Sequence, residues 1–221
     1  MTAVPTSPLV FPVGQFLGAR HLQPGAPPAH WDVRVGWQQL RLESEDEFIA
    51  WSVAHGLTAR VERQAWTRAT LEVVLQGEAG VAHAAGLVGS LLERGLLVEV
   101  PQEAGPALDQ FARRHLVQPL LVGLGNAPDR FDTDAIGLVG LPPQMLADPA
   151  DFEVWQVAHL YPSIADAAAG MADLGRRAGG TEDWETEPAA VLQRVLGAMR
   201  RLISHNCLYL DVVVDPAARF R

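Results

Sequence analysis

The stretch FIAWSVAH at Phe48–His55 returns as FEVWQVAH at Phe152–His159, at a constant offset of 104 residues. The two stretches share Phe, Trp, Val, Ala and His in the same order. Phe, Trp and His stand at positions i, i+3 and i+7, which lie on one face of an α-helix. The sequence therefore predicts that one core helix occurs twice in the chain.

The residues before each stretch predict a matching helix start. Ser44 is followed three residues later by Glu47, which is the capping-box pattern. The counterpart has Asp148 as the cap, Pro149 at the first helical position and the acidic Asp151 three residues after the cap. Different residues thus serve the same purpose at aligned positions, which favours a shared structure.

The flanking patterns extend the repeat over most of the chain. In the first copy we expect strands Phe11–Arg20 and Trp31–Leu42, helices Trp66–Gln76 and Ala79–Arg94, and a strand Leu96–Val100. In the second copy we expect strands Leu120–Asn126 and Ala135–Leu141, helix Ser163–Arg177, a helix capped by Thr186 and running to His205, and a strand Cys207–Val214. Gly95 and Asn206 follow the last helix of each copy, and both residue types tolerate the left-handed conformation that ends a helix.

Each copy reads β-β-α-α-α-β, and the segment SLLERGLLVEV at Ser90–Val100 resembles a winged helix-turn-helix recognition helix that runs into its wing strand. The resemblance implies an α+β fold made by tandem duplication of a winged-helix-like unit. The units are expected at 1–103 and 119–221, with a connecting helix at 104–118. A full wing needs two strands after the third helix, so the upstream hairpin is expected to complete the sheet.

Composition narrows the classes of function. The chain has 221 residues and a formal charge of −9, which weighs against non-specific binding to phosphate backbones. All 17 basic residues are arginine, so chemistries that need a lysine are excluded. Cys207 is the single cysteine, which excludes an internal disulfide. The N-terminal MTAVPTSPLV does not read as a signal peptide and no apolar run is long enough to span a membrane, so we expect a cytoplasmic protein.

No pattern in the sequence is typical of a catalytic or metal site. The histidines form neither a His-x-x-His nor a His-Glu-x-x-His pattern, and no Gly-x-Ser-x-Gly nucleophile motif occurs. Gly123-Leu124-Gly125 lacks the third glycine and the following helix of a dinucleotide-binding loop. We therefore expect a protein without enzymatic activity, cofactor or metal.

The third helix of each copy and the acidic segment before the last one are the candidate interaction surface. The first copy offers small and polar side chains at His83, Gly86 and Ser90, which favour close packing against another protein or a second copy. The second offers a row of arginines, and Trp184 stands in an acidic segment. We expect an adaptor or regulator that binds a protein or peptide; the alternative is a DNA-binding transcriptional regulator that uses Arg194, Arg200 and Arg201.

The repeated Trp and His residues allow two interpretations. Trp51, His55, Trp155 and His159 could line a small-molecule pocket between the two units, as in a metabolite sensor. The simpler interpretation makes the tryptophans core residues and the histidines hydrogen-bonding groups at a helix end, where exposed carbonyls need donors.

Overall fold

The computed structural model describes residues 6–215, so the extreme ends of the two expected units and the first residues of the N-terminal stretch lie outside it. The fold is mixed α+β, as predicted. The strands are β1 (Leu9–Pro12), β2 (Gln15–Arg20), β3 (His30–Val35), β4 (Gln38–Leu42), β5 (Leu97–Val100), β6 (His115–Pro119), β7 (Val122–Ala127), β8 (Arg130–Gly137), β9 (Met145–Ala147) and β10 (Leu208–Val212). The helices are α1 (Glu45–Val53), α2 (Thr58–Val61), α3 (Arg68–Gly77), α4 (Ala84–Glu93), α5 (Pro106–Arg114), α6 (Pro149–Val157), the 3-10 turn η1 (Ala158–Leu160), α7 (Ile164–Arg177), α8 (Asp183–Thr186) and α9 (Pro188–Ser204).

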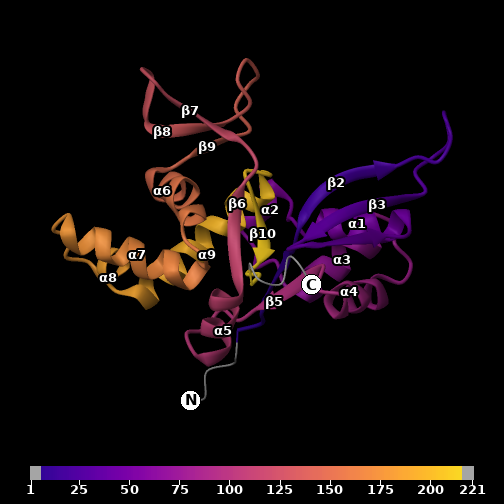
Figure 1. Ribbon diagram of the computed structural model, residues 1–221, viewed down its shortest axis with the longest axis horizontal. Helices are drawn as coiled ribbons and strands as arrows, with labels where there is room; N and C mark the ends of the chain where they lie inside the picture. The colour runs from indigo at the N-terminus through magenta and orange to yellow at the C-terminus, as the bar shows by residue number, and fades with distance from the viewer. Residues whose placement is uncertain (1–5, 216–221) are drawn as a thin grey trace.

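Small antiparallel sheets organise both halves of the chain. In the first half, β1 pairs with β5, and β2, β3 and β4 form a three-stranded sheet. In the second half, β6 pairs with β10, and β7, β8 and β9 form another three-stranded sheet. Figure 1 shows β6 and β10 in the middle of the molecule, the first-half helices α1, α3 and α4 on one side, and α7 and α8 on the other. In each half, therefore, the first strand pairs with the last. The tandem duplication and the likeness to a winged helix stay predictions.

Two of the expected strands are each broken by a glycine turn. The expected strand Phe11–Arg20 is wrong as one element, because Gly14 has a φ of +99° and separates β1 from β2. The expected strand Trp31–Leu42 is likewise two strands, since Gly36 has a φ of +55° and forms the turn between β3 and β4. A positive φ is accessible to glycine at little cost, so the chain can change direction at Gly14 and reverse at Gly36.

The connecting helix expected at 104–118 is shorter than predicted. Helix α5 ends at Arg114, and His115–Pro119 is the strand β6, which pairs with β10. The His115 ring ends the helix, because its Nδ1 lies 2.9 Å from the Phe111 carbonyl oxygen and the His115 backbone is extended. Val117, the middle residue of β6, is buried, and the other four residues of the strand are half-buried. Residues 115–119 therefore belong to the sheet of the second half.

The predicted helix starts and stops are mostly present. The Glu47 amide donates to Ser44 Oγ at 3.2 Å, and the Asp151 amide donates to Asp148 Oδ1 at 2.8 Å. Gly95 and Asn206 have φ angles of +71° and +55°. Three starts differ from the prediction. Helix α3 begins at Arg68 rather than Trp66, and α4 begins at Ala84 rather than Ala79. Helix α9 begins at Pro188 with Glu187, rather than Thr186, at the N-cap position, where it makes no side-chain cap hydrogen bond.

The two halves meet along β10. The Gly14 amide donates to the Leu210 carbonyl at 2.7 Å, and the Gly36 amide donates to the buried Asp211 carboxylate at 2.7 Å. A Cβ at Gly36 would lie 2.5 Å from Val214 Cγ1, so the β3–β4 turn packs directly on the end of the chain's last described strand. We call this contact of Gly14 and Gly36 with β10 the joint.

The joint predicts a difference between two glycines in positive-φ turns. Gly36→Ala should lower the free energy of unfolding by about 3 kcal/mol, because it combines a strained φ with a collision against Val214. Gly140→Ala should cost about 1 kcal/mol, since Gly140 has a φ of +84° but no described atom lies within 4 Å of its Cβ position. Urea unfolding followed by tryptophan fluorescence measures both values. Equal losses would contradict the packing of this turn at the joint.

Candidate functional site

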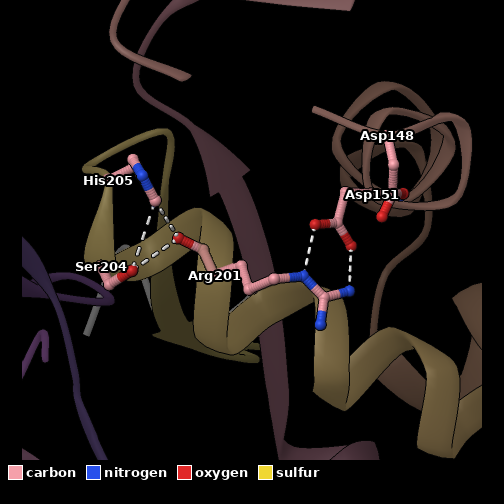
Figure 2. A network of polar contacts seen from close by, with 5 residues as sticks. All are labelled: Asp148, Asp151, Arg201, Ser204 and His205. Atoms are coloured by element: carbon pink, nitrogen blue, oxygen red, sulfur yellow. Dashed lines mark hydrogen bonds and ion pairs between the residues drawn. The ribbon is translucent and has the colours of Figure 1, made fainter. Parts of the chain in front are cut away.

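The arginines of α9 that we predicted as surface contacts are engaged inside the molecule. Figure 2 shows the Arg201 guanidinium facing the carboxylate of Asp151, to which it donates two hydrogen bonds. Asp151 is only 1% exposed, and burial raises its pKa even though Arg201 acts in the opposite direction. The Arg201 carbonyl in turn accepts from Ser204 Oγ at 2.8 Å and lies 2.9 Å from His205 Nδ1. Arg201 therefore ties α9 to the start of α6.

Arg200 connects the halves instead of facing solvent. Its Nη2 donates to the carbonyl oxygens of Val61 and Gln64, at 2.6 and 3.1 Å. Val61 is the last residue of α2, so Arg200 satisfies carbonyls at a helix C-terminus, where a cation is favoured. Burial lowers the pKa of Arg200 from its usual high value, with Arg201 adding to the effect. The guanidinium of Arg200 is thus committed to a contact between α9 and α2.

The predicted residues of α4 lie on another part of the surface. His83 is exposed at the start of the helix, Gly86 is exposed with open space around it, and Ser90 is half-buried. The buried face of α4 consists of Ala84, Val88 and Leu91. Figure 1 places α4 and α8 at opposite sides of the molecule, so these residues do not join Trp184 in one surface.

Trp184 and Arg194, in contrast, share one cleft. We define the helix cleft as a cavity of about 800 Å³ between the ends of α6, α7, α8 and α9; the residues that line it are Asp148, Pro149, Ala150, Glu153, Met171, Leu174, Gly175, Ala178, Gly179, Gly180, Thr181, Trp184, Glu185 and Arg194. The Trp184 side chain is 49% exposed, and the Arg194 Cζ lies 5.7 Å from its ring centroid. Arg194 Nη1 also donates to Glu153 at 2.8 Å. The Arg194 guanidinium therefore contacts both the Trp184 ring and the Glu153 carboxylate in the lining of the cleft.

The lining of the helix cleft is part apolar and part acidic. Pro149, Met171 and Leu174 supply apolar surface, and Leu174 is itself exposed. The lining also contains three carboxylates, Asp148, Glu153 and Glu185, and one guanidinium, that of Arg194. Such a lining suits an apolar group that carries a positive charge, because the excess carboxylates offer it partners.

A second cavity lies at the joint and contains half of the predicted inter-unit pocket. We define the joint pocket as a cavity of about 330 Å³; its lining residues are Gly14, Gln15, Phe16, Phe48, Trp51, Ser52, His55, Gly56, Leu120, Ser204, Asn206 and Tyr209. The first eight come from the first half of the chain and the last four from the second. Trp51 and His55 therefore line a cavity at the boundary between the two halves.

His55 is a neutral hydrogen-bonding group in this pocket. Its Nδ1 lies 3.2 and 3.1 Å from the carbonyl oxygens of Trp51 and Ser52. Because carbonyls only accept, Nδ1 carries the proton and Nε2 is an acceptor. Burial lowers the pKa of His55 to about 4, although the two carbonyls act to raise it. The Trp51 ring meets the imidazole edge-on at 4.6 Å and donates its own N–H to the Val13 carbonyl at 3.3 Å.

Trp155 and His159 do not line the joint pocket. Trp155 stacks on Phe152 with ring centroids 5.4 Å apart and approaches Gly123 of β7. His159 Nδ1 lies 3.4 Å from the Trp155 carbonyl, which repeats the arrangement of His55 and Trp51. Trp155 thus packs against the sheet of its own half, and His159 bonds back to the end of α6.

Sequence reasoning missed several residues of both cavities. Glu153 and Leu174 in the helix cleft, and Phe16, Asn206 and Tyr209 in the joint pocket, come from elements that are distant in the sequence. Phe16 lies within an expected strand, and the alternation of that strand is the only signal that could have pointed to its exposed face. Asn206 was interpreted as a helix stop, which it also is.

Comparisons with known proteins give no relative. No protein-family model matches the chain, and neither a curated protein nor a solved structure shows significant similarity to it.

Two further observations concern residues 6–215. None of their helices is both long and apolar enough to cross a membrane, and they contain no group of three or more His, Cys, Asp or Glu side chains placed to hold a metal ion. Burial raises the pKa of Cys207 to about 12, so its thiol stays protonated at neutral pH.

The ion pair between Arg201 and Asp151 should stabilise the second half. Arg201→Met leaves the Asp151 carboxylate buried without its partner, and we expect a loss of about 3 kcal/mol in the free energy of unfolding. Asp173→Ala removes the carboxylate of the exposed pair with Arg177 and should change stability by less than about 0.5 kcal/mol. Chemical denaturation of the two variants gives the comparison. A loss for Arg201→Met no larger than that for Asp173→Ala would contradict an internal role for this arginine.

Burial of His55 predicts a pH-dependent loss of stability. Between about pH 6.5 and pH 4 the unfolded chain takes up a proton at His55 that the folded chain does not, so the free energy of unfolding falls as the pH falls. His55→Gln cannot take up this proton. From pH 7 to pH 4 the unmodified protein should therefore lose up to about 3 kcal/mol more stability than the variant, at about 1.4 kcal/mol per pKa unit. Parallel stability curves for the two proteins would show that His55 is not held neutral.

Proposed function

We propose that the chain is a non-enzymatic adaptor or regulator that binds a protein or peptide partner in the helix cleft. The observation that carries the proposal is the half-exposed Trp184, which lies beside Arg194 in a cleft that also contains apolar side chains. Tryptophan and arginine are the side chains that most often contribute the main share of binding energy at protein interfaces. We also propose that the two halves are copies of one unit and that the protein works in the cytoplasm.

The shape and charge of the helix cleft suggest what the partner presents. A cavity of about 800 Å³ takes several side chains, and its apolar lining residues Met171 and Leu174 suit an aliphatic or aromatic anchor. Its acidic lining residues suit an arginine or lysine next to that anchor. The chain's formal charge of −9 would also attract a basic partner during encounter. The expected ligand is therefore a basic, partly apolar segment of another protein.

The arrangement of α9 favours protein binding over DNA binding. A recognition helix presents free arginines or amides to base edges in the major groove. Here Arg194, Arg200 and Arg201 each bond to an oxygen of the chain itself, and more than half of the residues of α9 are buried. Exposing these arginines to DNA would break three internal contacts. The regulator that reads DNA through α9 is therefore the weaker alternative.

An affinity experiment with matched variants tests the proposal. The purified protein, immobilised and exposed to a lysate, should retain one stoichiometric protein partner and no DNA. Trp184→Ala should reduce the retained amount at least about tenfold, as expected for a central interface aromatic worth about 2 kcal/mol. Phe131→Ala, which removes an 80% exposed aromatic ring outside the cleft, should leave retention unchanged.

Retention should also weaken with added salt, because the acidic residues of the helix cleft contribute charge attraction that ions screen. A partner retained equally by Trp184→Ala would contradict the helix cleft as the binding site. A salt-sensitive DNA shift with no protein partner would contradict the proposed function and favour the regulator.

A further inference from the structure

We infer that the joint pocket binds a small, uncharged, planar aromatic molecule, which would bridge the two halves of the chain. The inference does not depend on the proposed partner, since the helix cleft has a separate set of lining residues. It rests on the aromatic wall, the uncharged lining and the hydrogen-bonding groups at the joint.

The wall of the joint pocket is a connected group of aromatic rings. Phe16 lies 5.5 Å from Phe48 and 6.0 Å from Trp51, measured between ring centroids. Trp31 stacks on the far side of Phe48 at 5.1 Å with nearly parallel planes, which fixes the orientation of that ring. The Phe16 side chain is nevertheless 42% exposed rather than buried. An exposed ring that adjoins a cavity offers a surface on which a flat ligand can stack.

The lining of the joint pocket excludes a charged ligand. None of its twelve described lining residues is acidic, lysine or arginine, and His55 is neutral at physiological pH. The Arg34 guanidinium, which lies beside two of the lining residues, donates to Gln15 and to the Tyr209 hydroxyl at 2.8 Å each. A carboxylate, phosphate or ammonium would lose its hydration without gaining an opposite charge, which is costly in a confined site.

Neutral hydrogen-bonding groups are placed around this aromatic wall. His55 Nε2 is an acceptor, because Nδ1 carries the proton. Ser52, Gln15 and Asn206 add hydroxyl and amide groups that can both donate and accept. A cavity of about 330 Å³ is at the small end of ligand pockets. These features together fit a compact ring that carries an amide or similar neutral polar group.

The position of the pocket gives binding a structural consequence. Tyr209 and Asn206 flank the last helix-to-strand turn of the second half, while Phe16 and His55 belong to the first half. A ligand in contact with both sets adds an attraction across the joint, so it should stabilise the folded chain by an amount that grows with the logarithm of its concentration above the dissociation constant.

A set of three matched probes tests the inference. Benzamide, benzoate and benzamidine share one ring and differ in charge, being neutral, anionic and cationic at pH 7. Titration of each into the full-length, isotope-labelled protein is followed through the indole N–H resonance of Trp51, assigned by its loss in Trp51→Phe. Benzamide has about nine non-hydrogen atoms, so binding in the low millimolar range is the expected affinity. We expect a saturable shift with benzamide and at least tenfold weaker responses with the two charged probes.

Two variants and a control locate the site. Phe16→Ala removes an exposed wall residue and should weaken benzamide binding about tenfold. Asn206→Gly keeps the left-handed turn at a φ of +55° and should weaken binding several-fold by removing a polar partner. Phe131→Ala, on the other three-stranded sheet, should bind benzamide as the unmodified protein does. A lack of saturable shift with benzamide, equal responses to all three probes, or full binding by Phe16→Ala would each overturn the inference.

Discussion

The buried carboxylate of Asp211 is the constraint on which the arrangement of the two halves depends. Burying a carboxylate is costly unless it accepts hydrogen bonds, and this one accepts from the amides of Gly36 and of its own neighbour Val212, at 2.7 and 2.9 Å. Gly36 can approach because it lacks a side chain, and Gly14 makes the parallel contact with Leu210. With the first-half sheet held against β10 in this way, Arg34 reaches Tyr209 and Arg200 reaches α2. The joint pocket, which is lined by residues of both halves, follows from this arrangement.

The part of the fold that could be predicted from sequence is the part that local chemistry determines. Ser44 and Asp148 start helices because their side chains bond amides three residues ahead, and Gly95 and Asn206 stop helices through their own backbone conformation. The joint could not be predicted, because Gly36 and Asp211 are 175 residues apart and neither carries a motif. The split strands were missed for a related reason: a glycine within an apolar run reads as part of a strand until the turn around it is seen.

In the two cavities, likewise, contacts between residues close in the sequence could be predicted, and contacts between distant residues could not. Trp51 and His55 are four residues apart on one helix, so their proximity was predictable, whereas Phe16 and Tyr209 reach the same pocket from β2 and β10. Trp184 and Arg194 were each singled out for composition, but their contact depends on the way α8 folds back on α9. Arg200 and Arg201 were expected on the surface because arginine usually is. Their partners, a helix-end carbonyl and the buried Asp151, are visible only in three dimensions.

The pairing of first strands with last strands has a consequence for how the chain is made. A ribosome delivers β1 and β2 well before β10, which supplies the Leu210 carbonyl and the Asp211 carboxylate. The first half can close on itself once β5 appears, yet its Gly14 and Gly36 amides must wait, solvated, for about another hundred residues. The surface of the first half at the joint is therefore completed only when β10 has formed against it.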